Sequence, residues 1–193
     1  LKNLVSVRCD LTITAAYTGE TLAGLENLTA CESLRIGSAA HPNETLRQLS
    51  LPALKEIKGD LCVYGTALQT ADFKSLQSVA GHFVLQSDAL LQLTADELTT
   101  VAGNMTLIGT TADEAKAPCE QMYFPKLQRI DGTLTLSRFD RLSGLGTTFG
   151  VLTQAGALRY EHLALANTFE FPLIETTGNI TVTDCPILRS VLL

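Results

Sequence analysis

The side chains that most often catalyse reactions or bind metals are scattered through this sequence. The three histidines, His41, His82 and His162, form neither an H-x-H nor an H-E-x-x-H pattern, the close spacings that hold zinc. The segment RLSGLG (141–146) lacks the preceding glycine of a nucleophile elbow. No phosphate-binding loop or EF-hand loop is found. We therefore predict no catalytic residue, no cofactor and no metal site, and hence a protein that is not an enzyme.

Cysteine and asparagine are more informative, because they indicate a compartment. The five cysteines fit an oxidising environment, and without a C-x-x-C motif they favour neither zinc binding nor thioredoxin-type chemistry. Four of the six asparagines begin N-x-S/T sequons, where chance would give about one. The predicted glycosylation sites are Asn27, Asn43, Asn104 and Asn179. We therefore predict a secreted or cell-surface protein that carries N-linked glycans.

Charge and hydropathy exclude two classes of partner. The net charge is −6, and no basic stripe is present to neutralise the phosphates of a nucleic acid or to attract an anionic membrane. No apolar run approaches 18 residues, so we predict no membrane insertion within this segment. Residue 1 does not begin a signal peptide, which leads us to expect a mature or trimmed segment of a longer chain.

A repeat defines the elements that must position all of these side chains. In FPKLQRIDGTLTLS (124–137), apolar residues lie eight, five and two positions before Gly132, and two and four positions after it. The same frame recurs along the chain, in some copies shortened by one residue before the anchor. The eight anchor residues are Cys9, Glu32, Gly59, Gly81, Gly103, Gly132, Gly156 and Gly178. Spacings of 22–29 residues are typical of a solenoid, with insertions near 38–50 and 109–121.

The physics of one copy favours β-structure. Apolar residues two and four positions after the anchor alternate with polar ones, which predicts a short strand with the apolar side chains inward. The spacing of three before the anchor suits a tight turn or a bent extended arm better than a helix, which would use too much of the repeat. Stacked copies would share a core, with strands about 4.8 Å apart. The alternative, unrelated strands of a β-sandwich, does not account for eight copies in one frame.

The segments LPALKEIKGDLCV (51–63), FKSLQSVAGHFVL (73–85) and FPKLQRIDGTLTL (124–136) resemble the repeats of receptor L domains. They are even more similar to the repeats of fungal GPI-anchored cell-wall organisation proteins. The resemblance implies one domain over residues 1–193, a short right-handed parallel β-helix of about eight leucine-rich-repeat-like coils. It also implies an extracellular or cell-surface protein that is usually not an enzyme.

Stacking places further residues close together. Cys9 is an anchor, and Cys31 directly precedes the next anchor, so we predict a Cys9–Cys31 disulfide, with two buried thiols as the alternative. The partners of Cys62, Cys119 and Cys185 stay open.

The outward strand positions three and five residues after each anchor contain no carboxylate pair in adjacent coils, which argues against a carbohydrate-active β-helix enzyme. Their threonines resemble an ice-binding array, but Arg35 and Arg159 interrupt it, and exposed threonine is common in strands. The most apolar outward patch comprises Tyr64, Val84, Gln86 and Ile108. Such a patch fits a protein partner, unless the nearby insertions cover it.

The coil ends suggest assembly. The first copy is in frame from Leu1, and ILRSVLL (187–193) is apolar, so neither end has the polar cap that solenoids need. We therefore predict a non-catalytic surface scaffold or recognition module within a larger assembly, joined by coil ends or by the strand face. The alternatives are a receptor-type ligand-binding lobe and a carbohydrate-active enzyme.

Overall fold

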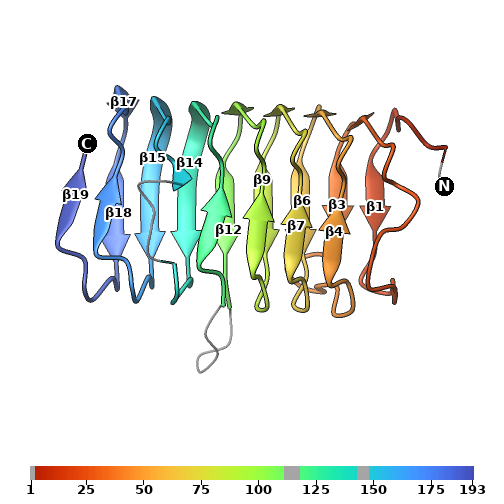
Figure 1. Ribbon diagram of the computed structural model, residues 1–193, viewed down its shortest axis with the longest axis horizontal. Helices are drawn as coiled ribbons and strands as arrows, with labels where there is room; N and C mark the ends of the chain where they lie inside the picture. Colours follow the sequence, from red (N-terminus) through yellow and green to blue (C-terminus); the bar gives the residue numbers. More distant parts are fainter. Residues whose placement is uncertain (1–2, 111–117, 143–147) are drawn as a thin grey trace.

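The computed structural model describes residues 3–110, 118–142 and 148–193, and these residues form an all-β solenoid. About eight coils are stacked along one axis, with the N-terminal coil at one end and the C-terminal coil at the other (Figure 1). Among the described residues, the strands of neighbouring coils pair in parallel, as expected when each coil repeats the course of the one before. The predicted fold class is confirmed.

The strands of the described residues lie on three faces of the solenoid. The first face precedes the anchor and contains β2 (Ala30–Cys31), β5 (Glu56–Ile57), β8 (Ser78–Val79), β11 (Thr100–Val101), the start of β14 (Arg129–Ser137), the start of β15 (Gln154–Glu161) and β17 (Thr176–Thr177). The second face follows the anchor and contains β1 (Leu11–Ile13), β3 (Leu34–Ile36), β6 (Leu61–Tyr64), β9 (Phe83–Gln86), β12 (Met105–Ile108), the ends of β14 and β15, and β18 (Ile180–Thr183). The strands β14 and β15 run around the corner, so they join these two faces into one sheet.

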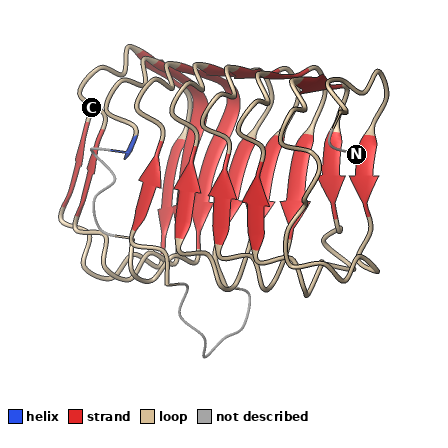
Figure 2. Cartoon of the chain, turned by 45° about the vertical axis from the view of Figure 1, so that its right-hand side comes forward, coloured by secondary structure: helices blue, strands red, loops and turns tan. Residues whose placement is uncertain are grey.

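The third face contains β4 (Gln48–Ser50), β7 (Thr70–Asp72), β10 (Gln92–Thr94), β13 (Gln121–Tyr123), β16 (Thr168–Glu170) and β19 (Ser190–Leu192). Sequence analysis predicted only the strands of the second face. Each strand of the third face is a triplet whose central residue points inward, as in the buried Leu49, Leu93 and Phe169. Loops join the faces along the long edges of the solenoid (Figure 2).

The anchor frame is confirmed by backbone hydrogen bonds. The N–H of Gly81 donates to the carbonyl of Gly59 at 2.8 Å, and Gly103 donates to Gly81 at 2.9 Å. These anchor glycines do not have a positive φ, so freedom to adopt a left-handed turn is not the reason for glycine here. Glycine is instead required by close approach, because a Cβ on Gly103 would lie 2.6 Å from the carbonyl oxygen of Gly81.

The spacing of three before each anchor is a β-turn rather than a helix. Leu76 donates its N–H to the carbonyl of Phe73 at 2.9 Å, and Leu54 donates to Leu51 at 3.1 Å. Both residues of each pair are fully buried, so the turn aims two apolar side chains into the core. This agrees with the predicted tight turn.

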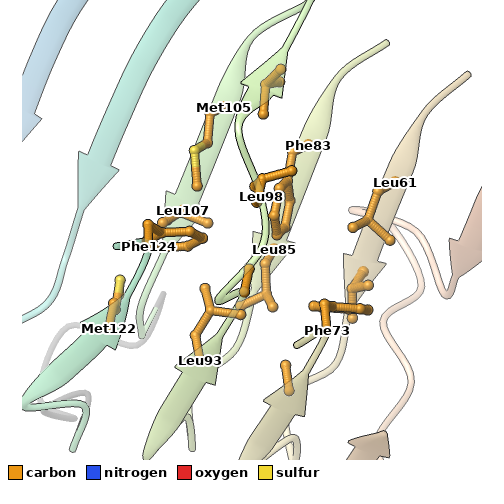
Figure 3. Close-up of a cluster of buried hydrophobic side chains, with 14 of the residues drawn as sticks. Leu61, Phe73, Phe83, Leu85, Leu93, Leu98, Met105, Leu107, Met122 and Phe124 are labelled. Atoms are coloured by element: carbon orange, nitrogen blue, oxygen red, sulfur yellow. The ribbon is translucent and has the colours of Figure 1, made fainter. Parts of the chain in front are cut away.

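The core runs the length of the solenoid as columns of like side chains. In the central coils, inward leucines, phenylalanines and methionines of the second and third faces and of the adjoining turns pack together (Figure 3). Phe73, Phe83, Phe124, Phe149 and Phe171 form a chain of ring contacts with centroids 5.5–6.5 Å apart. Hydrophobic burial and aromatic packing between neighbouring coils therefore hold the stack together.

Candidate functional site

The second face presents the outward patch that the sequence singled out. Strands β6, β9 and β12 lie side by side, and their register brings Tyr64 next to Gln86, and Gln86 next to Ile108. Val84 lies beside Cys62 on one side and Thr106 on the other. We call Tyr64, Val84, Gln86 and Ile108 the central patch. All four are half-buried, so their outer surfaces reach solvent from a rigid sheet.

Charged pairs flank the central patch toward both ends of the solenoid. Arg35 donates to the Asp60 carboxylate at 2.9 Å, and Arg159 lies 2.6 Å from the Glu161 carboxylate. The backbone N–H of His82 holds the pKa of Asp60 below its ordinary value, and Arg35 acts in the same direction. The patch is therefore a mixed apolar and amide surface, bordered by the Arg35–Asp60 pair on one side and by the hydroxyls of β14 on the other, a composition found in many protein interfaces.

Burial also affects the two acidic protons at the patch. It raises the pKa of the Tyr64 phenol and that of the neighbouring Cys62 thiol above their ordinary values. Both groups are thus neutral around pH 7, which suits a surface for contact rather than a nucleophile.

A column of polar side chains at the corner after the anchor was not predicted as a structural element. Ser33, Asp60, His82 and Asn104 each accept a hydrogen bond from a backbone N–H of the following coil, at 2.9–3.3 Å. The signal was present in the sequence, because the residue after most anchors can accept a hydrogen bond. The column gives His82 a structural role, since its Nδ1 accepts the N–H of Asn104.

The three histidines lie in different coils. His162 lies 3.2 Å from the Asp184 carboxylate in the next coil, and His41 is in the loop before Asn43. Within the described ranges, no three histidine, cysteine or acidic side chains are close enough to hold a metal ion.

One predicted glycosylation site conflicts with the structure. Asn43 is fully buried, and its amide donates to the carbonyl of Tyr17 at 2.8 Å while its Oδ1 accepts the N–H of Leu46 at 2.7 Å. The third sequon residue, Thr45, also donates to Tyr17 at 2.7 Å. Because the Asn43 side chain is fully buried, the folded coil leaves no room for a glycan on its amide, which argues against this site. Asn27, Asn104 and Asn179 are exposed.

The structure does not form the predicted Cys9–Cys31 disulfide, and all five cysteines are free. The two residues are close along the stack, but Cys31 faces the core and Cys9 is exposed, so the coil wall separates their thiols. Burial raises the pKa of Cys31 to about 11, and that of Cys119 likewise to about 11.

A shallow groove lies on the third face, over β7 and β10. It has a volume of about 270 Å³ and is lined by Thr70, Ala71, Asp72, Lys74, Gln92, Thr94 and Asp96. The Asp72 carboxylate already accepts from the Lys74 N–H at 3.1 Å and from the Ser50 hydroxyl at 3.3 Å. Sequence analysis missed this groove because it did not predict the third face.

The comparisons with known proteins leave the family open. No protein-family model, curated protein or solved structure matches this chain. Among the described residues, no helix is long and apolar enough to cross a membrane.

Proposed function

We propose that this chain is a non-catalytic scaffold and recognition module of a secreted or cell-surface assembly, and that it binds a protein partner through the central patch. The observation that carries this proposal is the in-register row of Tyr64, Gln86 and Ile108, half-exposed on a rigid sheet. A sheet held on both sides pre-organises these side chains, so binding costs little ordering entropy. Aromatic and aliphatic side chains with a polar border are enriched in protein interfaces.

A photo-crosslinking experiment tests the patch. A photoreactive amino acid at Gln86 should capture one defined protein on the surface of the source cells, and the same group at Gln48 on the third face is the matched control. With the captured partner purified, Ile108→Lys should weaken binding by at least about tenfold, since it puts an ammonium group in an apolar contact. Equal capture from both positions, or unchanged affinity of Ile108→Lys, would contradict the proposal.

The compartment has its own test. Three exposed sequons support secretion, so protein from its native host should lose mass when treated with an N-glycosidase. Peptide mapping should find glycans among Asn27, Asn104 and Asn179 and none at Asn43. An unchanged mass after treatment would remove the secretory part of the proposal.

The groove over β7 and β10 supports a second candidate, carbohydrate binding or cleavage. Two carboxylates, Asp72 and Asp96, line it with amide, hydroxyl and ammonium groups, which are the groups that recognise sugar hydroxyls. Incubation with a polysaccharide panel distinguishes the candidates. Reducing ends that appear with the native chain, and disappear with Asp96→Asn, would favour an enzyme over the scaffold.

A further inference from the structure

The third face presents two rows of polar side chains on its outer surface. Its strands β4, β7, β10 and β13 form one sheet, and their register stacks equivalent outward residues along the solenoid axis. The first row has an amide or a hydroxyl in every strand and comprises Gln48, Thr70, Gln92 and Gln121. The second row comprises Ser50, Asp72, Thr94 and Tyr123. All of these side chains are exposed or half-buried, so both rows are open to a ligand.

Two hollows border on these rows. The groove over β7 and β10 has a volume of about 270 Å³. A second hollow, of about 130 Å³, is lined in part by Thr21, Gln48 and Ser50, and it continues the polar surface toward the first coil. Neighbouring strands of a sheet are about 4.8 Å apart, which is close to the length of one sugar unit in an extended β-linked chain. A polysaccharide along the solenoid axis would therefore meet an equivalent pair of polar side chains at each strand.

Asp72 is held in place to accept hydrogen bonds from such a ligand. One carboxylate oxygen accepts the N–H of Lys74 at 3.1 Å, and the other accepts the Ser50 hydroxyl at 3.3 Å. Because each oxygen of an ionised carboxylate has a second lone pair, Asp72 can still accept two hydroxyls from neighbouring carbons of a sugar ring. In the next strand, the Gln92 amide donates to the Thr94 hydroxyl at 3.3 Å, which fixes a further donor and acceptor.

Tyr123 adds an aromatic surface to the second row, directly beside Thr94. Its side chain is 44% exposed, and its hydroxyl donates to the side-chain oxygen of Gln121, which holds the ring along β13. The C–H face of a sugar ring packs on an aromatic ring in this position. In these four strands none of the outward side chains is aliphatic, whereas the core of a protein interface is apolar.

The charges of this surface favour a neutral ligand. Asp72 and Asp96 line the groove together with Lys74, so charges of both signs are present. Beside the groove, Lys126 forms an ion pair with Glu97 at 2.7 Å. A polyanion would meet carboxylates here and no cluster of cations, and a polycation would meet ammonium groups.

We propose that the third face binds an extended, neutral, β-linked polysaccharide that lies along the solenoid axis, with one sugar ring packed on Tyr123. The inference rests on the carbohydrate candidate given above, and it deepens that candidate by naming the ligand class and the residues that hold it. It does not involve the central patch, which lies on the second face. A polysaccharide and a protein partner could therefore be held at the same time.

Native electrophoresis in gels that contain hydroxyethylcellulose, a neutral β-linked polysaccharide, tests the proposal. The chain should be retarded in proportion to the polysaccharide concentration, and polygalacturonate, a polyanion, should not retard it. Tyr123→Ala should weaken binding roughly threefold to tenfold, because the sugar loses its aromatic contact. Tyr123→Phe keeps the ring and should bind nearly as well as the native chain. Gln77→Ala removes an exposed amide on another face and is the matched control.

The outcomes that overturn the proposal are distinct from those that affect the central patch. Unchanged migration in hydroxyethylcellulose, stronger retardation by polygalacturonate, or equal binding by Tyr123→Ala would each overturn it. Ile108→Lys should bind the polysaccharide like the native chain, whatever its effect on a protein partner. Cleavage of another polysaccharide of the panel, without retardation by hydroxyethylcellulose, would keep the carbohydrate candidate and overturn this inference.

A series of cello-oligosaccharides tests the direction of the ligand. Calorimetric titration should show an affinity that rises with each added sugar up to about four units, since the sheet has four strands, and then levels off. Asp72→Asn should weaken the binding of the longer oligosaccharides roughly threefold to tenfold, because a neutral amide replaces a charged acceptor. An affinity that stops rising at two sugars would mean that the ligand does not follow the rows, and would overturn the proposal.

Discussion

The central coils and the last coil follow the same sequence repeat, but their inward residues are not equally buried. Leu134, in the sixth coil, lies between Met105 and Leu158 and is fully buried. Ile180 has the same position in the eighth coil, but only Leu158 covers it, and it is partly exposed. The stability that an inward residue contributes therefore depends on how many neighbouring coils cover it, and its position in the repeat alone does not determine that contribution.

The largest expected difference is in the free energy of unfolding. Leu134→Ala should lower it by about 2–5 kcal/mol, because the cavity would be closed in by coils on both sides. Ile180→Ala should lower it by only about 1 kcal/mol, because the open end already exposes part of the side chain. Urea denaturation followed by circular dichroism measures both. Similar losses for the two variants would show that the ends are as well packed as the centre.

This contrast also explains which parts of the fold could be predicted. The frame around Gly132 located the anchors, the turns and the second face, because those positions repeat with nearly constant spacing. The third face was missed because its strands have only three residues and its inward residue varies from Ala71 to Phe169. Its distance from the anchor also changes where an insertion intervenes.

Some residues of the candidate sites could be predicted from the repeat and others could not. The central patch could be located by counting outward residues from each anchor, because strand alternation is strict. The environments of Asn43 and Cys9 could not, since they depend on contacts with the neighbouring coil. Asn43 lies in an insertion, where exposure is the usual expectation, yet it bonds the carbonyl of Tyr17 in the first coil. Likewise, the repeat predicted that Cys9 and Cys31 lie in neighbouring coils. It could not predict that Cys31 points into the core while Cys9 points to solvent.

A second, smaller difference concerns how the first coil is held. Asn43→Ala should lower the free energy of unfolding by about 2–3 kcal/mol, because it leaves the buried N–H of Leu46 without its acceptor. Hydrogen exchange should show lost protection mainly in the first coil, through the lost bond to Tyr17. Asn104→Ala, at an exposed corner, should cost less than about 1 kcal/mol, because water can replace its bond to the N–H of Thr133. Loss of protection spread evenly over all coils would contradict the view that Asn43 holds the first coil through its local bond to Tyr17.

The smallest difference is visible only as chemical reactivity, and it needs no mutation. Cys31 and Cys119 lie in the buried core, and a pKa of about 11 leaves roughly one thiol in a thousand ionised at pH 8. Cys9, in the first coil, is exposed. Alkylation of the native protein, mapped by mass spectrometry, should therefore modify Cys9 first, and Cys31 and Cys119 last.

The slowly reacting Cys31 and Cys119 should react faster as the pH rises toward 11, because the thiolate fraction grows about tenfold per pH unit below the pKa. Fast reaction of Cys31 at pH 8 would contradict its burial and mean that the first two coils open readily.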